Sequence, residues 1–493
     1  MKYFQKILAI LLVTGLLAGC APSIPPTSGD PTEVDTTPKF VATTEEERLY
    51  IRLFDLANKV EIQIHMSDEE LAKMQADYEH YSSFGSKSPI YRKADVTVTI
   101  HSANGTERYD IEEVGVRMKG NTSRTDFYSP EEGIYNAIHL KLDFQETFDD
   151  PAYYGSDALT WTEKDRKERK NRTFATLEKL EVRWNKNDDG TYIREGYAYE
   201  IYRSFGVMAP MSSLASVDFG GEHFGVCAIN EPVDEVFLEK RLPKSQLGGD
   251  LYKCGWAKSG ARFTDLGSIG IEDEDKGQFY SYDLKSNRST STHERLKHLI
   301  NALNSSVLSK FRMEAMLDMP YFVNYAAASY NLGNPDDLRN NFNNFYLYFL
   351  ADTGKAVIIP YDYDRCLGVN KDWDPTGHGM TREDPFASIT AADGKPQKNP
   401  LFIHTVCAGG WYIQEYKEAL QRGLENPLLT EGEFNARYFQ AQSLYADDTA
   451  PSRVFRNAEN CNFRFDINDT SHGNLTFGDY IARKLATLRN ALG

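Results

Sequence analysis

The chain has 493 residues, of which 41% are hydrophobic, 12% aromatic and 26% charged. These are globular proportions, so they exclude a disordered or fibrous protein, and the length leaves room for two or three domains or one bilobed unit. Acidic residues outnumber basic ones by 72 to 55, for a net charge of -17. We therefore expect no nucleic-acid partner, because a general nucleic-acid binder needs a basic face.

The N-terminus has the pattern of a secretory signal. Two lysines precede an apolar run over residues 7–17, which ends in Leu17-Ala18-Gly19-Cys20. A basic start, a short apolar core and small residues before the cleavage point are typical of such signals, and the run is too short to span a bilayer comfortably. Because the ending resembles that of bacterial lipoproteins, we predict removal of residues 1–19 and lipidation of Cys20, which would anchor the chain outward-facing in a bacterial cell envelope. An ordinary signal with a chance cysteine is the alternative.

Residues 20–45 are rich in Pro, Ser and Thr, which predicts a disordered tether. No second linker of this kind follows. We expect a strand-rich lobe over residues 46–255 and a helical lobe over residues 256–493. The five cysteines after Cys20 show no CxxC pair and no zinc-type spacing, so we expect reduced thiols or at most occasional bridges.

Apolar alternation predicts strands in the first half of the chain. The alternating segments are residues 60–64, 96–100 and 138–144. Asn104-Gly105 follows the second segment and predicts a hairpin turn, while Ser67 followed by Glu70 has the form of a capping box that begins a helix. In the third segment Lys141 lies on the face opposite the apolar residues.

Apolar residues at helical spacing predict helices in the second half. The predicted helices are residues 292–304, 308–331, 411–424, 432–446 and 477–492. One hairpin interrupts them, with strands over residues 345–350 and 356–360 around the turn-forming Asp352-Thr353-Gly354-Lys355. A strand-rich front and a helical back predict an α+β fold.

A dense group of acids and amides surrounds that hairpin. Asn344 and Asp362 are each nine residues from the centre of the turn, so antiparallel pairing predicts that they lie side by side, with Asp364 on the same side. Asp336 and Asp337, which follow the preceding helix, are expected at the same open end of the hairpin. Gathered carboxylates repel one another unless a cation lies among them, and oxygen ligands favour Mg²⁺, Mn²⁺ or Ca²⁺ over zinc. A solvated turn beside a loop that caps itself is the alternative.

The order of these residues has a precedent in protein kinases, where an acid and then an Asn precede a hairpin and a metal-binding Asp follows it. Asp336 and Asn341 reproduce the spacing of that acid and Asn, although the HRD sequence is absent. Asp218-Phe219-Gly220 spells the kinase DFG motif but precedes the acidic group, so we interpret it as a hairpin turn. The sequence has no Walker A loop, HExxH or GxSxG motif.

Residues 116–124 end a predicted strand with cations, a glycine and small polar side chains. Such a loop offers backbone N–H groups and positive charge to a phosphate, and a plain exposed turn is the alternative. Lys141 could reach an anion in a cleft, although a solvated lysine is the usual outcome.

The combination resembles the spore coat protein H (CotH) family of secreted, kinase-like proteins. The similar segments, in the family's order, are RMKGNTS (117–123), HLKLDF (139–144), YIREGYAYEIYRSFG (192–206), FGVCAINEPVDEVFL (224–238), GDLYK (249–253), GNPDDLRNNFNNFYLYF (333–349) and PYDYDRCLG (360–368). The resemblance implies an atypical protein-kinase-like bilobed fold, with a strand-rich N-lobe and a helical C-lobe. It also implies binding of ATP with Mg²⁺ or Mn²⁺ and phosphorylation of Ser or Thr on a protein.

The resemblance implies roles for individual residues around the hairpin. The implied metal ligands are Asp362, its neighbour Asp364 and, as the second ligand, Asn341 or Asn344. The implied catalytic acid is Asp336 or Asp337, and we prefer Asp336 together with Asn341. The acid pair lies two or three residues further from the hairpin strand than in the family's usual pattern, which leaves open which acid is the base.

The implied ATP-binding residues come from the first half of the chain. Arg117, Lys119, Asn121 and Ser123 would line the phosphate loop. Lys141 would contact phosphate, and Glu195, near the start of the following helix, would orient that lysine.

We therefore expect a secreted, lipid-anchored atypical protein kinase that transfers the γ-phosphate of ATP to Ser or Thr of a surface or coat protein. The expected partners are a basic, Ser-rich protein substrate and the membrane. Because a lipoprotein faces a compartment where ATP is scarce, a surface-anchored binding or adhesion module without catalysis is the alternative. A carbohydrate-active protein that stacks sugars on its aromatic side chains is a third hypothesis.

Overall fold

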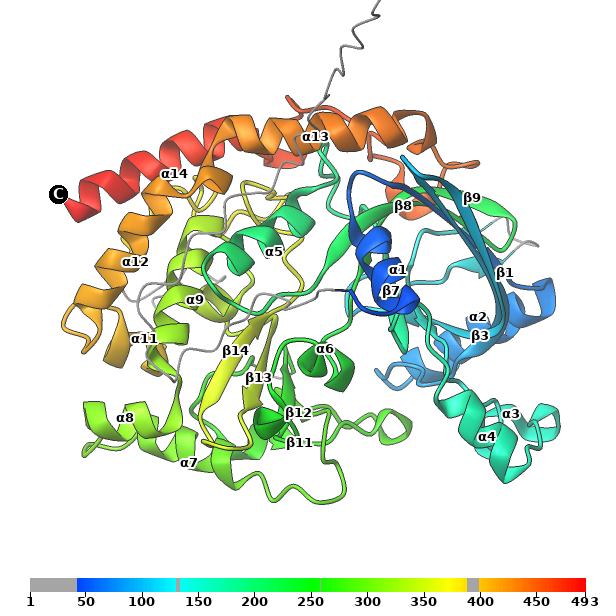
Figure 1. Cartoon of the computed structure of the whole chain (residues 1–493), viewed down its shortest axis with the longest axis horizontal. Coiled ribbons are helices and arrows are strands. Elements are labelled where there is room, and N and C mark those ends of the chain that lie inside the picture. Colours follow the sequence, from blue (N-terminus) through cyan, green and yellow to red (C-terminus); the bar gives the residue numbers. More distant parts are fainter. Residues whose placement is uncertain (1–41, 130–133, 258, 388–398) are drawn as a thin grey trace, which may run out of the picture. The chain divides into compact units, whose positions relative to one another are not determined.

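Seven strands from the first half of the chain close into a barrel in the order β1-β2-β3-β6-β7-β9-β8. They are β1 (Lys59–His65), β2 (Arg92–Ser102), β3 (Gly105–Lys119), β6 (His139–Asp143), β7 (Lys179–Trp184), β8 (Ser212–Phe219) and β9 (Glu222–Asn230). The structure is a computed structural model that describes residues 42–129, 134–257, 259–387 and 399–493 (Figure 1). The predicted signal, Cys20 and the predicted tether as far as residue 41 lie outside the described residues.

A second sheet has the strand order β11-β12-β10-β13-β14. Its strands are β10 (Leu251–Cys254), β11 (Ile269–Gly270), β12 (Tyr282–Leu284), β13 (Phe345–Phe349) and β14 (Ala356–Pro360). A short pair, β4 (Tyr128–Ser129) and β5 (Ile134–Tyr135), forms a third sheet.

Helices follow and separate these strands. In the first half they are α1 (Glu45–Phe54), α2 (Asp68–Ser82), α3 (Pro151–Tyr154), α4 (Glu163–Lys170), α5 (Arg194–Ser204) and α6 (Glu235–Glu239). In the second half they are α7 (Glu294–Leu303), α8 (Lys310–Met316), α9 (Met319–Leu332), α10 (Leu338–Asn341), α11 (Pro400–Thr405), α12 (Ile413–Glu425), α13 (Glu431–Tyr445) and α14 (Phe477–Leu492). The fold is α+β, as predicted. None of the helices within the described ranges combines the length and apolar character that crossing a membrane requires.

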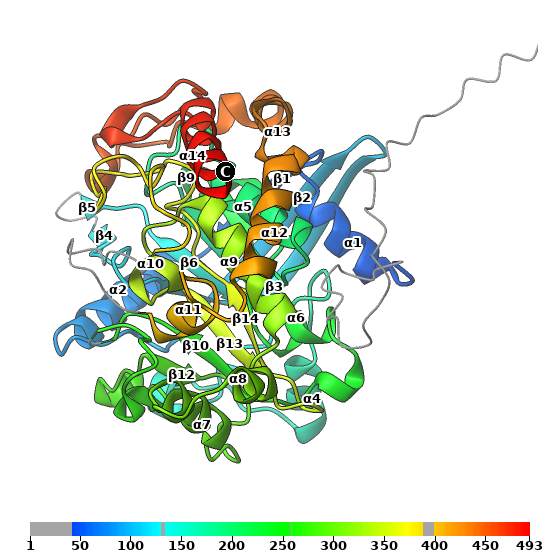
Figure 2. The same ribbon diagram turned by 90° about the vertical axis from the view of Figure 1, so that its left-hand side faces the viewer.

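Each of the two larger sheets has its own apolar core. Side chains such as Val60, Leu140 and Val182 fill the barrel. The second core is built around α9, which is buried along nearly its whole length and packs against β14, α5 and α12. Figure 2 shows α12 and α14 side by side on this part of the molecule.

Most predicted elements are confirmed. The three alternating segments lie in β1, β2 and β6, and the hairpin strands are β13 and β14. Asp218 and Phe219 end β8, and two left-handed glycines lead into β9, so the DFG sequence is a hairpin turn as predicted. Ser67 caps α2 by accepting from the Glu70 N–H, but the Glu70 carboxylate accepts from the Lys93 N–H, so the predicted capping box is only half formed.

Two predictions require correction. The helix predicted over residues 308–331 is split into α8 and α9, because Asp318 caps a new helix and Pro320 lies in its first turn. The predicted lobe boundary at residue 255 cuts through the second sheet, because β10 pairs with β12 and β13. The five described cysteines are free, in agreement with their scattered spacing.

Tyr445, at the end of α13, joins the helical part of the chain to the barrel. Its buried hydroxyl accepts from the Val60 N–H at 2.8 Å and donates to the Leu214 carbonyl at 2.8 Å. Tyr445→Phe should therefore lower the free energy of unfolding by about 1–3 kcal/mol, because a buried N–H loses its acceptor. Urea unfolding measures this loss.

Tyr128→Phe is the matched control, because it removes a hydroxyl that donates to Asp68 at the surface. We expect a change within about 0.5 kcal/mol for this variant. Equal losses in the two variants would show that Tyr445 does not fasten α13 to the barrel.

Candidate functional site

The end of α9 and the hairpin β13–β14 position the candidate site. Gly333 ends α9 in the left-handed region at φ 58°, and a Cβ at this position would lie 2.3 Å from the Tyr480 hydroxyl oxygen, so only glycine fits. The loop that follows carries Asp336, and Asp362 lies just beyond the end of β14.

Arg183 lies at the centre of this site. Leu180, Val182 and Trp184 belong to the barrel core, and Arg183 projects from the other face of β7. One of its nitrogens donates to Glu195 of α5 at 2.7 Å, and the other donates to Asp362 and, at 2.8 Å, to Asp364. A single guanidinium, 5% exposed, therefore holds three carboxylates together.

Burial and charge give the two aspartates beyond β14 different acidities. Burial opposes ionisation of Asp362, but Arg183 and Lys119 hold the pKa of this carboxyl below its ordinary value. Burial and the charge of Asp362 raise the pKa of Asp364. Asp362 is therefore the carboxyl of the pair that favours the ionised form, and Asp364 is the one that is protonated more readily.

Three asparagine side chains surround Asp336. Asn341 and Asn343 donate to one carboxylate oxygen at 2.6 and 3.0 Å, and Asn344 donates to the other at 3.1 Å. Burial raises the pKa of Asp336, and the charge of nearby Asp362 adds to the rise. Asp336 is thus a positioned carboxyl with increased proton affinity.

Asp337 has a different environment. Its carboxylate is fully buried and accepts from the Asn340 N–H at 2.8 Å, from Ser329 at 2.6 Å and from Tyr363 at 3.1 Å. Burial raises the pKa of Asp337 to about 6. It caps α10 and fastens the loop, whereas Asp336 is partly exposed and faces the asparagines.

The predicted pairing of Asn344 with Asp362 is wrong by one residue. Phe345 pairs with Pro360, and the Tyr361 N–H donates to the Asn344 carbonyl at 3.2 Å. The turn closes between Leu350 and Lys355, so its centre lies half a residue before Thr353. Asn344 and Asp362 both have left-handed backbones, at φ 55° and 59°, so neither continues its strand. Asn344 nevertheless belongs to the site, because its side-chain amide donates to the Asp336 carboxylate.

The predicted phosphate loop is only partly directed toward these acids. Lys119 forms an ion pair with Glu181 and donates to the Tyr361 hydroxyl at 3.1 Å, which places it beside Asp362. Ser123 donates to the Lys119 carbonyl at 3.2 Å and so closes the loop, whereas Asn121 is exposed. Lys186, just beyond the end of β7, donates to Thr122 at 2.6 Å and so contacts the loop.

Arg117, Lys141 and Glu195 do not take the predicted arrangement. Arg117 donates to the Ser88 carbonyl at 3.2 Å and stacks on Tyr91. Glu195 pairs with Arg183 instead of Lys141, because α5 follows β7 directly and brings Glu195 onto the strand that carries Arg183. Lys141 is instead the cross-strand neighbour of Arg117 and Glu181.

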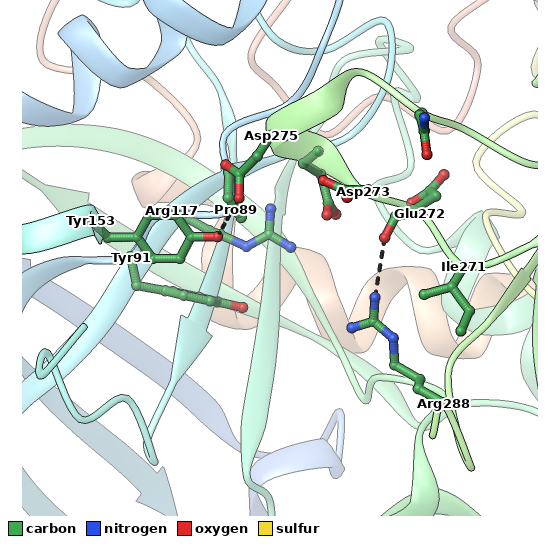
Figure 3. A pocket seen from close by; sticks show the side chains of 11 residues that line it. Pro89, Tyr91, Arg117, Tyr153, Ile271, Glu272, Asp273, Asp275 and Arg288 are labelled. Carbon is green, nitrogen blue, oxygen red and sulfur yellow. Dashed lines mark hydrogen bonds between the residues drawn. The ribbon is translucent and has the colours of Figure 1, made fainter. Parts of the chain in front are cut away.

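A pocket of about 530 Å³ opens next to Arg117 (Figure 3). Tyr91, Tyr153 and Asp275 lie at the Arg117 side, and Glu272 and Arg288 lie opposite. Tyr153 donates to Asp275 at 3.0 Å, and Arg288 donates to the Glu272 carbonyl at 3.1 Å.

Sequence reasoning missed Arg183, Glu181, Asn343 and Tyr361. The signal for Arg183 was present, because residues 180–184 alternate and a helix with an early Glu follows them. A charged residue on the outer face of a strand is usually solvated, however, so the alternation alone did not distinguish it.

Arg183→Met should lower the free energy of unfolding by about 3–5 kcal/mol at pH 8, because three carboxylates lose their shared cation. In the wild type, the lowered pKa of Asp362 contributes stability that is lost only as the pH falls through that pKa. Without Arg183 the carboxyl pKa values rise, so protonation should restore stability to the variant as the pH falls from 8 to 5. Urea unfolding at both pH values measures the effect.

Arg437→Met is the control, because Arg437 pairs with Glu200 and Glu433 at the surface. Its loss should cost at most about 1 kcal/mol at either pH. A deficit of Arg183→Met that stays the same at pH 8 and pH 5 would contradict the assigned role.

Comparison with known proteins agrees with the resemblance of the sequence to the CotH family. A family model described as CotH kinase protein matches residues 156–447. Inner spore coat protein H of Bacillus subtilis strain 168 is 26% identical over 208 residues, which cover 41% of this chain and 54% of that protein. The chain thus spans about half the length of this relative. Since the family match covers more than half of the sequence, the chain belongs to the CotH kinase family.

Proposed function

We propose that the chain is a secreted, lipid-anchored atypical protein kinase that transfers the γ-phosphate of ATP to Ser or Thr of a surface or coat protein. The observation that carries this proposal is the contact of Arg183 with Glu195 and Asp362. In protein kinases a strand lysine pairs with a glutamate of the following helix, and a metal-binding aspartate follows a hairpin further along the chain. Arg183, Glu195 and Asp362 occur in that order and contact one another, which also supports a kinase-like bilobed fold.

The donor groups fit a hard divalent cation such as Mg²⁺ or Mn²⁺. Asn341 and Asn344 donate to Asp336 through their amide nitrogens, and among the described contacts neither amide oxygen accepts a hydrogen bond. These oxygens and the carboxylates of Asp362 and Asp364 would hold the cation. Mg²⁺ is usually bound by one or two carboxylates together with substrate phosphates, so Asp362 and Asp364 would hold it together with the nucleotide.

The residues around the cation have distinct tasks in this proposal. Bound Mg²⁺–ATP would supply the phosphoryl group, with the metal neutralising its charge. Asp336, with its raised pKa, would orient the substrate hydroxyl and accept its proton. Arg183 would hold Asp362 and Asp364 in position, and Lys119 would add positive charge next to Asp362.

The cellular location is part of the proposal. The relative's name places that protein in the inner spore coat, and we propose that this chain also acts outside the cytoplasm. Lipidation of Cys20 would anchor it to a membrane, and a basic, Ser-rich coat or surface protein would be its substrate.

One observation favours the alternative of a binding module without catalysis. Arg183 already bridges Asp362 and Asp364, so these acids do not require a metal to lie together. Measuring phosphate transfer by the wild type and by variants of Asp336 and Asp362 distinguishes a scaffold of this kind from a kinase.

Asp336→Asn and Asp362→Ala should each reduce phosphate transfer by at least about a hundredfold while the chain stays folded, because each removes a group needed at the transferred phosphate. Transfer of label from [γ-³²P]ATP, to the chain itself and to basic Ser-rich peptides, measures the rate with Mg²⁺ or Mn²⁺.

Asp218→Asn is the matched control, because Asp218 belongs to a DFG sequence in the β8–β9 turn, where it contacts His223. Its transfer rate should equal that of the wild type. Transfer that persists in Asp336→Asn and Asp362→Ala would refute the assigned site, and no transfer by the wild type would favour the binding module.

A further inference from the structure

A buried tyrosine of α5 contacts two separate parts of the candidate site. Tyr199, which is 1% exposed, donates its hydroxyl proton to the Glu195 carboxylate at 3.0 Å. The same hydroxyl oxygen accepts from the Asp362 N–H at 3.1 Å. One hydroxyl therefore joins the helix that follows β7 to the segment that follows β14.

The spacing of residues along α5 explains why this tyrosine faces the site. Glu195 and Tyr199 are four residues apart, so their side chains lie on the same face of the helix. Tyr197 lies on another face, where its hydroxyl donates to the Leu428 carbonyl at 2.7 Å and its ring contacts that of Phe434 of α13. The helix thus presents one buried tyrosine to the site and another to the helical part of the core.

The backbone of Asp362 leaves the hairpin at the point where Tyr199 contacts it. The N–H of Tyr361 still donates across the hairpin to the Asn344 carbonyl, but the N–H of Asp362 donates to Tyr199 instead. Asp362 has a left-handed backbone, at φ 59°, which is uncommon for a residue other than glycine. Such a conformation persists only where the surrounding structure holds it, and here the carboxylate contacts Arg183 while the N–H contacts Tyr199.

The chemistry of a phenol fits both partners at once. Burial and the negative charge of Glu195 raise the pKa of Tyr199 above its ordinary value, so the hydroxyl keeps its proton. That single proton goes to Glu195, which leaves the oxygen free to accept from the Asp362 N–H. A phenylalanine here would leave a buried N–H without its acceptor and a buried carboxylate with one donor fewer.

We infer that Tyr199 is a positioning residue, whose hydroxyl holds the backbone of Asp362 in the left-handed conformation from which its carboxylate serves as a metal ligand. The role of Asp362 as a metal ligand rests on the proposed function. Because the same hydroxyl bonds to Glu195, a shift of α5 would release the Asp362 backbone. The position of this helix and the binding of the metal are therefore coupled.

The first measurement needs neither metal nor nucleotide. Amide hydrogen exchange of the full chain is followed by mass spectrometry with fragmentation that resolves the Asp362 amide. In Tyr199→Phe this amide should exchange at least about tenfold faster than in the wild type, because it has lost its acceptor.

Tyr197→Phe is the matched control, because it removes a buried hydroxyl from the same helix without touching the site. Both variants should melt below the wild type, since each leaves one buried polar group without a partner. The Asp362 amide should nevertheless exchange at the wild-type rate in Tyr197→Phe.

The second measurement is the binding of Mn²⁺ in the presence of the non-hydrolysable ATP analogue AMP-PNP, followed by the electron paramagnetic resonance signal of free Mn²⁺. Tyr199→Phe should weaken binding of the metal at least about tenfold, and Tyr197→Phe should leave it unchanged. In transfer assays, excess Mn²⁺ should restore the rate of Tyr199→Phe. The KM for the peptide should not change, because Asp336 keeps its asparagine partners.

The outcomes separate this inference from the proposed kinase activity. Wild-type exchange of the Asp362 amide in Tyr199→Phe, or wild-type affinity of that variant for Mn²⁺, would overturn the inference whether or not the chain transfers phosphate. Equal effects of the two tyrosine variants would also overturn it, because lost stability would then explain both. The expected pattern in a chain without transfer would refute only the kinase proposal. A wild type that binds no Mn²⁺ would refute the proposed metal site and this inference with it.

Discussion

A single buried guanidinium fixes the relation between three distant parts of the chain. Arg183 of the barrel binds Glu195 of α5 and both aspartates beyond β14. Buried charges are costly unless each is paired with good geometry, so moving any of these elements would leave a carboxylate without its cation. The location of the open end of the β13–β14 hairpin, and with it that of the group around Asp336, therefore depends on the position of β7.

The outer face of the barrel shows a second consequence of this arrangement. Arg117, Lys141 and Glu181 form one row across β3, β6 and β7, on a face that many barrels expose to water. Beside this row Tyr361, just beyond β14, accepts from Lys119 of β3, and Lys253 of β10 lies over the Tyr361 ring. A polar contact of this kind stabilises a fold less than an apolar one.

Local sequence patterns were sufficient to predict most helices and strands, but they did not predict which strands pair or which distant side chains contact one another. Alternation, caps and turn residues identified β1, β2, β6, the β13–β14 hairpin and most of the second-half helices, because these signals act over a few residues. The partner of β10 and the exact hairpin register depend on contacts and loop closure that no local pattern encodes. Arg183 was missed for the same reason, since only the folded chain brings it to Asp362. Burial in turn distinguishes Asp337 from Asp336, which are adjacent in sequence.

The most direct test of the account is the melting temperature of the full chain with and without Mg²⁺ and ATP, beside Asp362→Ala. A ligand at a hundredfold its Kd adds about 2.7 kcal/mol, which for a chain of this size corresponds to roughly three degrees. The account predicts a rise that requires both metal and nucleotide in the wild type and is absent in Asp362→Ala. No rise in the wild type at millimolar ATP with any divalent metal, or an equal rise in the variant, would contradict it.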